Sequence, residues 1–344
     1  MKKIPLLVFG MALILAFAFY TYTNKDVKPM NHITGVTMGG IVYNVKFKGE
    51  HKAFKQEIDQ LLYAFNQSLS TYISDSEISE FNREGNFSYK SDYFLPVLEI
   101  SKEVFNATAG SFDPTIGPLV QAWGFGPDKK IPDLDSVKVD SLRSIVGFQN
   151  VIFDLLSVSM PTNYQLDFSA IAKGYAVDVI GEFLEREGVE DYLVEIGGEV
   201  RCRGLNDQMK SWSLGIEDPT VNNAAREILA IVRLNNRSLA TSGNYRNFYE
   251  KEGQLYAHII DPRTGYTAKH SLLSASVFAS DCIVADAYAT AFMVMGLEQS
   301  RTILNNQSNL DAIFVFRDVN GKLQTYVSDG IKPFVELNKT TDKN

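Results

Sequence analysis

The chain has 344 residues and a formal net charge of −8, from 33 Lys and Arg against 41 Asp and Glu. Its basic residues form no run longer than pairs such as Lys129-Lys130, so it lacks the basic face that binding to nucleic acid requires. The length fits one large domain or two closely associated ones, and an apolar content of 45% is ordinary for a globular protein.

Residues 1–22 are predicted to be a signal peptide or an N-terminal signal anchor. Lys2-Lys3 precede an apolar run from Pro5 to Tyr20, and Ala16-Phe17-Ala18 offers a cleavage site. The run is shorter than the roughly 20 residues of a full membrane span. No Cys follows it, so a lipoprotein anchor is not supported. We therefore expect the body of the protein to be exported, to the periplasmic side of the inner membrane, behind a polar linker at 23–33.

The remainder, 34–335, is predicted to be the functional domain, with a polar tail at 336–344. Strands and helices come in blocks rather than in strict alternation, which favours an α+β fold over a doubly wound sheet. Helices are predicted at 52–69, at 92–109, from Ser169 as N-cap to about Glu187, and around 281–290. Strands are predicted at 41–47, 192–196, 212–216, 228–234, 254–260 and 274–278, with a closing hairpin of 313–317 and 323–327.

Metal-binding and disulfide patterns are sparse. Cys202 and Cys282 are far apart in the chain, and their spacing leaves open whether they pair. No Cys and His lie at zinc-binding spacing, and the four His are scattered, which does not favour a transition-metal site.

Two segments in the first half of the chain suggest shaped loops. Residues 110–126 combine many Gly and Pro with aromatic side chains, which is typical of a rigid loop rather than a helix. Tyr72 lies before a helix-capping sequence at Asp75-Ser76-Glu77, where it can stack on a base or serve as a core or rim aromatic.

The run Leu166–Tyr175 contains Asp167 and Lys173 at the start of a predicted helix. A cation in the first turn is electrostatically misplaced because the helix N-terminus carries partial positive charge, and an anion such as phosphate would remove that conflict. The alternative is a lysine bent into solvent. Asp167 can accept hydrogen bonds from a ligand, or it can simply cap the helix.

The segment Ala257–Gly265 is predicted to be a strand end followed by a Pro/Gly turn that presents His258, Asp261 and Arg263 together. His258 is the natural candidate for a general base near neutral pH. The alternative is a histidine held in the turn by Asp261. The turn at Gly197-Gly198 and the polar loop 240–245 carry weaker signals.

Asp286 and Thr290 stand four residues apart in a run that reads as a buried helix, so both side chains should face one spot. Their hard oxygens suit Mg²⁺ or Ca²⁺, and they suit Mg²⁺ better if phosphates complete its coordination shell. Alternatively, Asp286 satisfies a nearby helix end and Thr290 bonds back to its own helix.

Taken in order, these runs resemble the ApbE-type FAD:protein FMN transferases from about residue 34 to the C-terminal region. Two departures stand out: Gly40 follows Met38-Gly39 where the family usually has Thr, and the lipobox Cys is missing. The motifs that carry the resemblance are Thr37-Met38-Gly39, Ser70-Thr71-Tyr72, Phe112-Asp113-Pro114-Thr115, Trp123-Gly124-Phe125-Gly126, Ala170–Tyr175 with Asp178, Ile196-Gly197-Gly198, Thr241-Ser242-Gly243, His258–Gly265 and Ala285-Asp286-Ala287 with Thr290.

The resemblance implies an α+β fold related to the T-fold, with FAD in a cleft between two lobes. It implies Mg²⁺ held by Asp286, Thr290 and the backbone carbonyl of Ala170. It further implies FAD contacts from Met38, Tyr72, Ser111, Phe112, Asp113, Asp167, Lys173 and the backbone of Ile260.

The family moves FMN from FAD onto a Ser or Thr hydroxyl of a target protein and releases AMP; the implied acceptors are membrane redox subunits. Two other functions stay open on the same residues. One is an FAD pyrophosphatase, in which water replaces the protein hydroxyl. The other is an exported flavin-binding protein without turnover.

Overall fold

The computed structural model describes residues 29–49, 54–126, 134–221, 227–244, 248–251 and 254–338. The predicted signal segment and most of the predicted linker lie outside these residues and stay predictions. Among the helices described, none combines the length and the apolar character needed to cross a bilayer.

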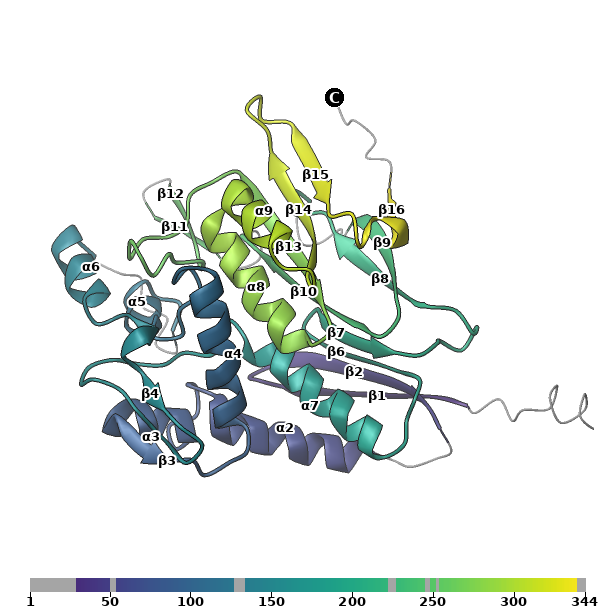
Figure 1. Ribbon diagram of the computed structural model, residues 1–344, viewed down its shortest axis with the longest axis horizontal. Helices are drawn as coiled ribbons and strands as arrows, with labels where there is room; N and C mark the ends of the chain where they lie inside the picture. Colours follow the sequence, from purple (N-terminus) through teal and green to yellow (C-terminus); the bar gives the residue numbers. More distant parts are fainter. Residues whose placement is uncertain are drawn as a thin grey trace, which may run out of the picture.

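An antiparallel sheet of eight strands forms the centre of the fold, in the order β1-β2-β6-β7-β10-β13-β14-β15 (Figure 1). The α+β prediction is confirmed. The strands are β1 (Met30–Thr37), β2 (Ile41–Lys48), β6 (Tyr192–Ile196), β7 (Glu199–Arg203), β10 (Arg237–Gly243), β13 (Leu272–Ala279), β14 (Asp311–Arg317) and β15 (Leu323–Val327).

Three smaller sheets surround this one. They are β16 (Val335–Leu337) with β9 (Ile228–Leu234) and β8 (Trp212–Glu217); β3 (Asn86–Ser88) with β5 (Ser157–Ser159) and β4 (Ile152–Phe153); and the hairpin of β11 (Phe248–Lys251) and β12 (Gln254–Ala257).

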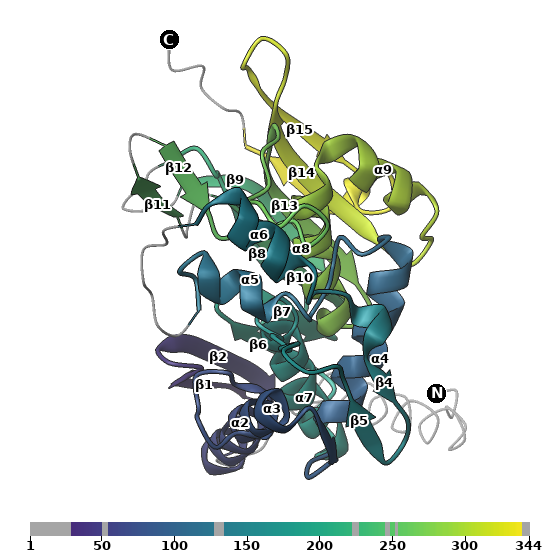
Figure 2. The same ribbon diagram turned by 90° about the vertical axis from the view of Figure 1, so that its left-hand side faces the viewer.

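The described helices gather mainly on one face of the central sheet, with α7 and α8 packed on each other and on its strands (Figures 1 and 2). They are α2 (Lys55–Leu69), α3 (Glu77–Glu84), α4 (Phe94–Ala107), α5 (Gly117–Ala122), α6 (Ser136–Arg143), α7 (Ala172–Arg186), α8 (Cys282–Met295) and α9 (Leu297–Asn305), with 3-10 turns η1 (Phe148–Asn150) and η2 (Lys332–Phe334).

The pleat of the central sheet divides the core into two. Successive side chains of a strand point to opposite faces, and so Ala240 and Val277 belong to the core under the helices while Leu239 and Phe278 belong to the core shared with β8 and β9. The molecule is therefore layered as helices, large sheet and small sheet.

Both cysteines are buried free thiols, on opposite sides of the central sheet. Cys282 belongs to the helix-side core and Cys202 to the core shared with β8 and β9. The sheet between them prevents the pairing that their spacing left open.

Three boundaries differ from the sequence prediction. The linker predicted at 23–33 is too long, because Met30–Ile33 already pairs with β2. The tail predicted at 336–344 begins too early, because Glu336 and Leu337 pair with β9. The strand predicted at 254–260 ends at Ala257, and Ile260 instead forms a single bridge to Thr267 across the following turn.

Two local predictions about helices were also wrong. Ser169 does not cap α7, which begins at Ala172 after Ile171 and has no side-chain cap of its own. The loop predicted at 110–126 contains α5, in whose first turn Pro118 is tolerated because that position needs no backbone donor.

Candidate active site

A cavity of about 600 Å³ opens where the start of α7 meets the middle of α8. Segments far apart in the sequence supply its walls, and eight of the predicted site residues are among them. The lining residues are Tyr72, Ile116, Val120, Gly124, Phe125, Asp167, Ser169, Ala170, Lys173, Ser242, His258, Ile259, Ile260, Asp286, Thr290 and Val294.

Asp286 joins the two helices at the floor of this cavity. Its side chain is 2% exposed, and its Oδ2 accepts the backbone N–H of Gly174 at 2.9 Å, in the first turn of α7. The helices approach so closely that a Cβ on Gly174 would lie 2.3 Å from the carbonyl oxygen of Cys282. Asp286 therefore satisfies a helix end, as the alternative interpretation predicted, and it also lines the cavity.

The bond from Gly174 has a consequence for Ala170. In a regular helix the N–H of Gly174 would donate to the carbonyl four residues earlier, which is that of Ala170. Because this N–H donates to Asp286 instead, the Ala170 carbonyl accepts no hydrogen bond from the described residues. The carbonyl of a cavity-lining residue is left available for a ligand.

Lys173 extends between two carboxylates. Its Nζ lies 2.6 Å from Glu199 Oε1 and 3.9 Å from Asp286 Oδ1. Burial would lower the pKa of Lys173, but the two carboxylates outweigh it and raise that pKa. The positive charge of Lys173 at the start of α7 is therefore balanced by Glu199 and Asp286, two partners that the local sequence did not indicate.

Burial acts on the carboxylates in the opposite direction. It raises the pKa of Glu199 to about 7 against the opposing effect of Lys173, and it raises the pKa of Asp286 as well. Glu199 is 2% exposed, and its Oε2 has no hydrogen-bond partner among the described residues. Since burial disfavours the charge on both carboxylates and they share one ammonium, a bound cation would stabilise their ionised forms.

The donors that converge here fit a hard divalent cation. Asp286 Oδ1 is too far from Lys173 for a hydrogen bond, the Ala170 carbonyl is available, and Thr290 lines the same cavity. All three are oxygens, which suits Mg²⁺. No group of three or more His, Cys, Asp or Glu side chains in the described part of the chain forms a metal cluster, so a magnesium ion here would take further oxygens from substrate and water.

Thr290 lies one turn beyond Asp286 on α8, as the spacing predicted. Its Oγ1 is 3.2 Å from Ser242 Oγ, at the end of β10. The hydroxyl therefore contacts a neighbouring strand and faces the cavity.

Asp167 and Tyr72 form the outer part of the cavity. Asp167 Oδ1 accepts the N–H of Ser169, and its own N–H donates to the Pro114 carbonyl, so it orders the turn before α7 but does not cap that helix, whose N-cap is Ile171. Partial burial and the charge of Asp167 raise the pKa of Tyr72, which is 61% exposed. Such a ring at the rim can stack on a planar ligand.

His258 follows β12 and lines the cavity, with its ring 6.3 Å from that of Phe125. Asp261 was the alternative partner for this histidine. Its carboxylate instead accepts Arg263 Nε at 2.9 Å and Nη2 at 2.8 Å, a bidentate pair that holds the turn. The Asp261–Arg263 pair therefore holds the turn, while the imidazole of His258 lines the cavity.

Four predicted site residues do not line the cavity. Met38 occupies the tight β1–β2 turn with a φ of +46°. Ser111 and Phe112 are buried, and Asp113 accepts the N–H groups of Thr115 and Phe148. Their predicted FAD contacts stay predictions.

Sequence reasoning missed other parts of the site. Glu199 follows the predicted turn at Gly197-Gly198, and only its position on β7 beside α7 makes it the partner of Lys173. Ser242 lies near the end of β10, in a segment that the sequence predicted only as a polar loop. The apolar wall of the cavity, from Ile116, Val120 and Val294, gave no signal in the sequence.

The chain matches the family model described as the ApbE family over residues 38–314. It is 36% identical to the FAD:protein FMN transferase of Vibrio cholerae over 315 residues, which cover 88% of this chain and 92% of that one. It is 33% identical to the FAD:protein FMN transferase of Haemophilus influenzae, with 99% of this chain and 100% of that one covered.

Solved structures agree with this match. The flavin transferase ApbE from Vibrio cholerae superposes with a TM-score of 0.80 at 33% identity, covering 89% of this chain and 99% of that one. The apo form of the flavinyl transferase ApbE from Pseudomonas stutzeri gives a TM-score of 0.79 at 31% identity, with 89% and 97% covered.

Proposed function

This chain belongs to the ApbE family, and we propose that it is an FAD:protein FMN transferase that moves FMN from FAD to a Ser or Thr hydroxyl of a protein and releases AMP. The observation that carries the proposal is the cavity itself. It gathers Lys173 of α7, Asp286 and Thr290 of α8, and His258 after β12, beside the available carbonyl of Ala170.

The reaction is a displacement at phosphorus. The acceptor oxygen forms a bond to the phosphorus of the FMN half of FAD, and the P–O bond to the AMP half breaks. AMP leaves with the electron pair of that bond, and the hydroxyl proton passes to a base. Phosphoryl chemistry of this kind depends mainly on positioning and on charges aimed at the phosphate oxygens.

Lys173 and the start of α7 would hold the pyrophosphate. The ammonium is kept protonated and in the cavity by Glu199 and Asp286, and a helix N-terminus favours an anion. Asp286, Thr290 and the Ala170 carbonyl would hold Mg²⁺. When bound, the ion would supply neutralisation of charge that builds up on the pyrophosphate during cleavage.

His258 would accept the proton of the acceptor hydroxyl, which is a poor nucleophile until that proton is taken. The bidentate pair of Asp261 and Arg263 supports this role because it fixes the turn that carries the histidine. Tyr72 and Asp167 would contact the flavin or the adenine at the cavity rim.

The acceptor would be an exported or membrane redox subunit, and the protein would act on the periplasmic side of the inner membrane. This part of the proposal rests on the apolar segment at Pro5–Tyr20 and on the family resemblance.

The test is incubation with FAD and MgCl₂, with and without a flavin-free acceptor protein, followed by measurement of AMP and of covalently bound flavin. Transfer predicts AMP that appears together with covalent flavin and depends on the acceptor. AMP and free FMN formed equally well without the acceptor would identify an FAD pyrophosphatase. Bound FAD without AMP would identify a flavin-binding protein.

A further inference from the structure

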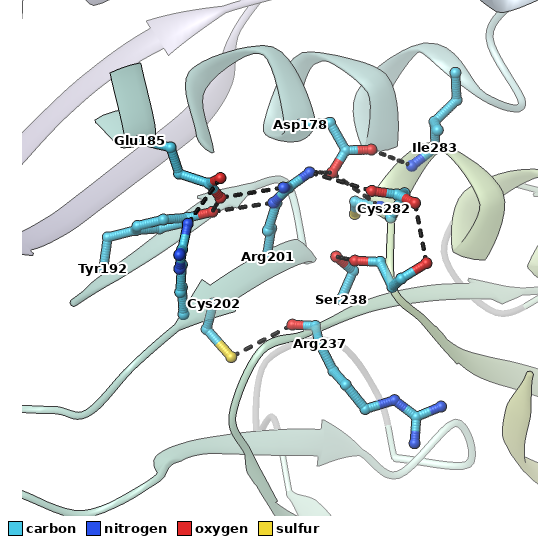
Figure 3. Close-up of polar contacts among 12 residues, drawn as sticks. Asp178, Glu185, Tyr192, Arg201, Cys202, Arg237, Ser238, Cys282 and Ile283 are labelled. Carbon is cyan, nitrogen blue, oxygen red and sulfur yellow. Dashed lines mark hydrogen bonds and ion pairs between the residues drawn. The ribbon is translucent and has the colours of Figure 1, made fainter. Parts of the chain in front are cut away.

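A network of charged side chains lies at the start of α8, between α7 and the central sheet (Figure 3). Asp178, on α7, is 2% exposed and accepts the N–H of Cys282 at 2.9 Å and of Ile283 at 2.8 Å. These are the first two residues of α8, whose own N-cap residue makes no side-chain cap. Asp178 therefore caps α8 from the neighbouring helix.

The two helices cap each other. Asp178 of α7 binds the first N–H groups of α8, and Asp286 of α8 binds the N–H of Gly174 at the start of α7. Neither helix has a side-chain cap of its own at this end. The pair of carboxylates fixes how far α8 can slide or rotate on α7, and hence where Asp286 and Thr290 stand relative to Ala170.

Arg201, on β7, anchors this arrangement from the central sheet. Its Nη1 lies 2.8 Å from Asp178 Oδ1, its Nη2 3.2 Å from Glu185 Oε1, and its Nε donates to the Tyr192 hydroxyl at 3.0 Å (Figure 3). A guanidinium presents its donors in a rigid fork, which suits a role that fixes geometry. Without it, Asp178 would be a buried carboxylate lacking a charged partner.

We propose that Asp178 and Arg201 are positioning residues for the reaction, which set the affinity of the magnesium site by fixing α8 on α7. They do not line the cavity and touch neither substrate nor metal; they act through the placement of Asp286, Thr290 and Ala170. The inference rests on the proposed magnesium site. Outer groups that orient metal ligands typically contribute about 10–100-fold to metal affinity.

The experiment measures metal binding rather than turnover. Mn²⁺ would stand in for Mg²⁺, and the free ion would be counted by electron paramagnetic resonance in the flavin-free full chain, at a temperature where each variant is folded by circular dichroism. The variants are Asp178→Asn, Arg201→Met and the milder Arg201→Lys. The control is Arg237→Met, which removes a partly buried pair, Arg237 with Asp311 at 2.8 Å, that joins β10 to β14 rather than α7 to α8.

We expect Asp178→Asn and Arg201→Met to weaken Mn²⁺ binding by about 10-fold, with Arg201→Lys between these and the wild type. Arg237→Met should lower thermal stability but leave Mn²⁺ affinity unchanged. Equal Mn²⁺ affinity in Arg201→Met and Arg237→Met would overturn the positioning role and leave the proposed function intact. A wild-type chain that binds no Mn²⁺, either flavin-free or in the presence of FAD, would instead refute the magnesium site, and this inference with it.

Discussion

Replacing Gly174 by alanine tests how closely α7 and α8 must approach. An ideal Cβ at this position would lie 2.3 Å from the Cys282 carbonyl oxygen and 2.7 Å from Asp286 Cβ. Carbon atoms pack best at about 3.5–4.0 Å, so the second contact is too short by about 1 Å. The first neighbour is backbone and cannot rotate away, so the helices themselves would have to separate.

Two opposing effects set the size of the change. Alanine is favoured over glycine in a helix interior by about 1 kcal/mol. Overpacking of a tight contact costs typically about 1–3 kcal/mol, and the substitution also strains the bond from Gly174 to Asp286. We therefore expect Gly174→Ala to lower the free energy of unfolding by roughly 1–2 kcal/mol, and to weaken metal binding because Asp286 is displaced.

Gly181→Ala on the same helix is the matched control for stability. A Cβ there meets side-chain atoms of Arg201 and Tyr192 at 2.9 and 3.0 Å, which can adjust more easily than backbone. Urea denaturation of both variants would measure the difference in stability. Because Gly181→Ala contacts Arg201, the Mn²⁺ titration would compare Gly174→Ala with the wild type. A Gly174→Ala protein as stable as wild type, with unchanged metal affinity, would refute the argument that this glycine sets the distance between the helices.

Four further predictions follow from the site. His258→Ala should lower turnover by about 10²–10⁴-fold while FAD affinity stays nearly constant, and parallel loss of both in fluorescence titration and rate assays would favour a structural role. Lys173→Met should weaken FAD binding by roughly 10-fold, more at low salt than at high salt. A loss of FAD affinity that is the same at every salt concentration would count against a phosphate contact. Asp286→Ala should abolish transfer more completely than FAD binding, so full activity in metal-stripped buffer would contradict the magnesium assignment. Because burial raises the pKa of the Cys202 thiol to about 12 and raises that of Cys282, neither should react with a thiol reagent until the protein is denatured, when two thiols should appear without reductant.

The parts of the site that follow a helical period could be predicted from sequence. Asp286 and Thr290 share a face of α8 because residues four apart always do, and both line the cavity. Lys173 lies in the first turn of α7 as predicted, although the N-cap of that helix is Ile171 and not the predicted Ser169. Five strands of the central sheet, β2, β6, β13, β14 and β15, could likewise be predicted as short apolar runs between turns, whereas β1, β7 and β10 were not predicted.

What the sequence did not reveal depends on contacts between distant segments. Glu199 became the partner of Lys173 only because β7 runs beside α7 in the folded sheet. The mutual capping by Asp178 and Asp286 needs both helices in place, and a local capping rule instead favoured Ser169. A lone glycine in a helix pattern gave no indication that a second helix would contact it.

The central claim is that this cavity transfers FMN to a protein hydroxyl. The most direct measurement is the ratio of AMP released to flavin covalently bound, using FAD, MgCl₂ and a flavin-free redox subunit, beside the same subunit with its acceptor Ser or Thr changed to Ala. The account predicts equal amounts of AMP and covalent flavin on the intact acceptor, neither on the altered one, and loss of both with EDTA. AMP accompanied only by free FMN, whichever acceptor is present, would contradict it.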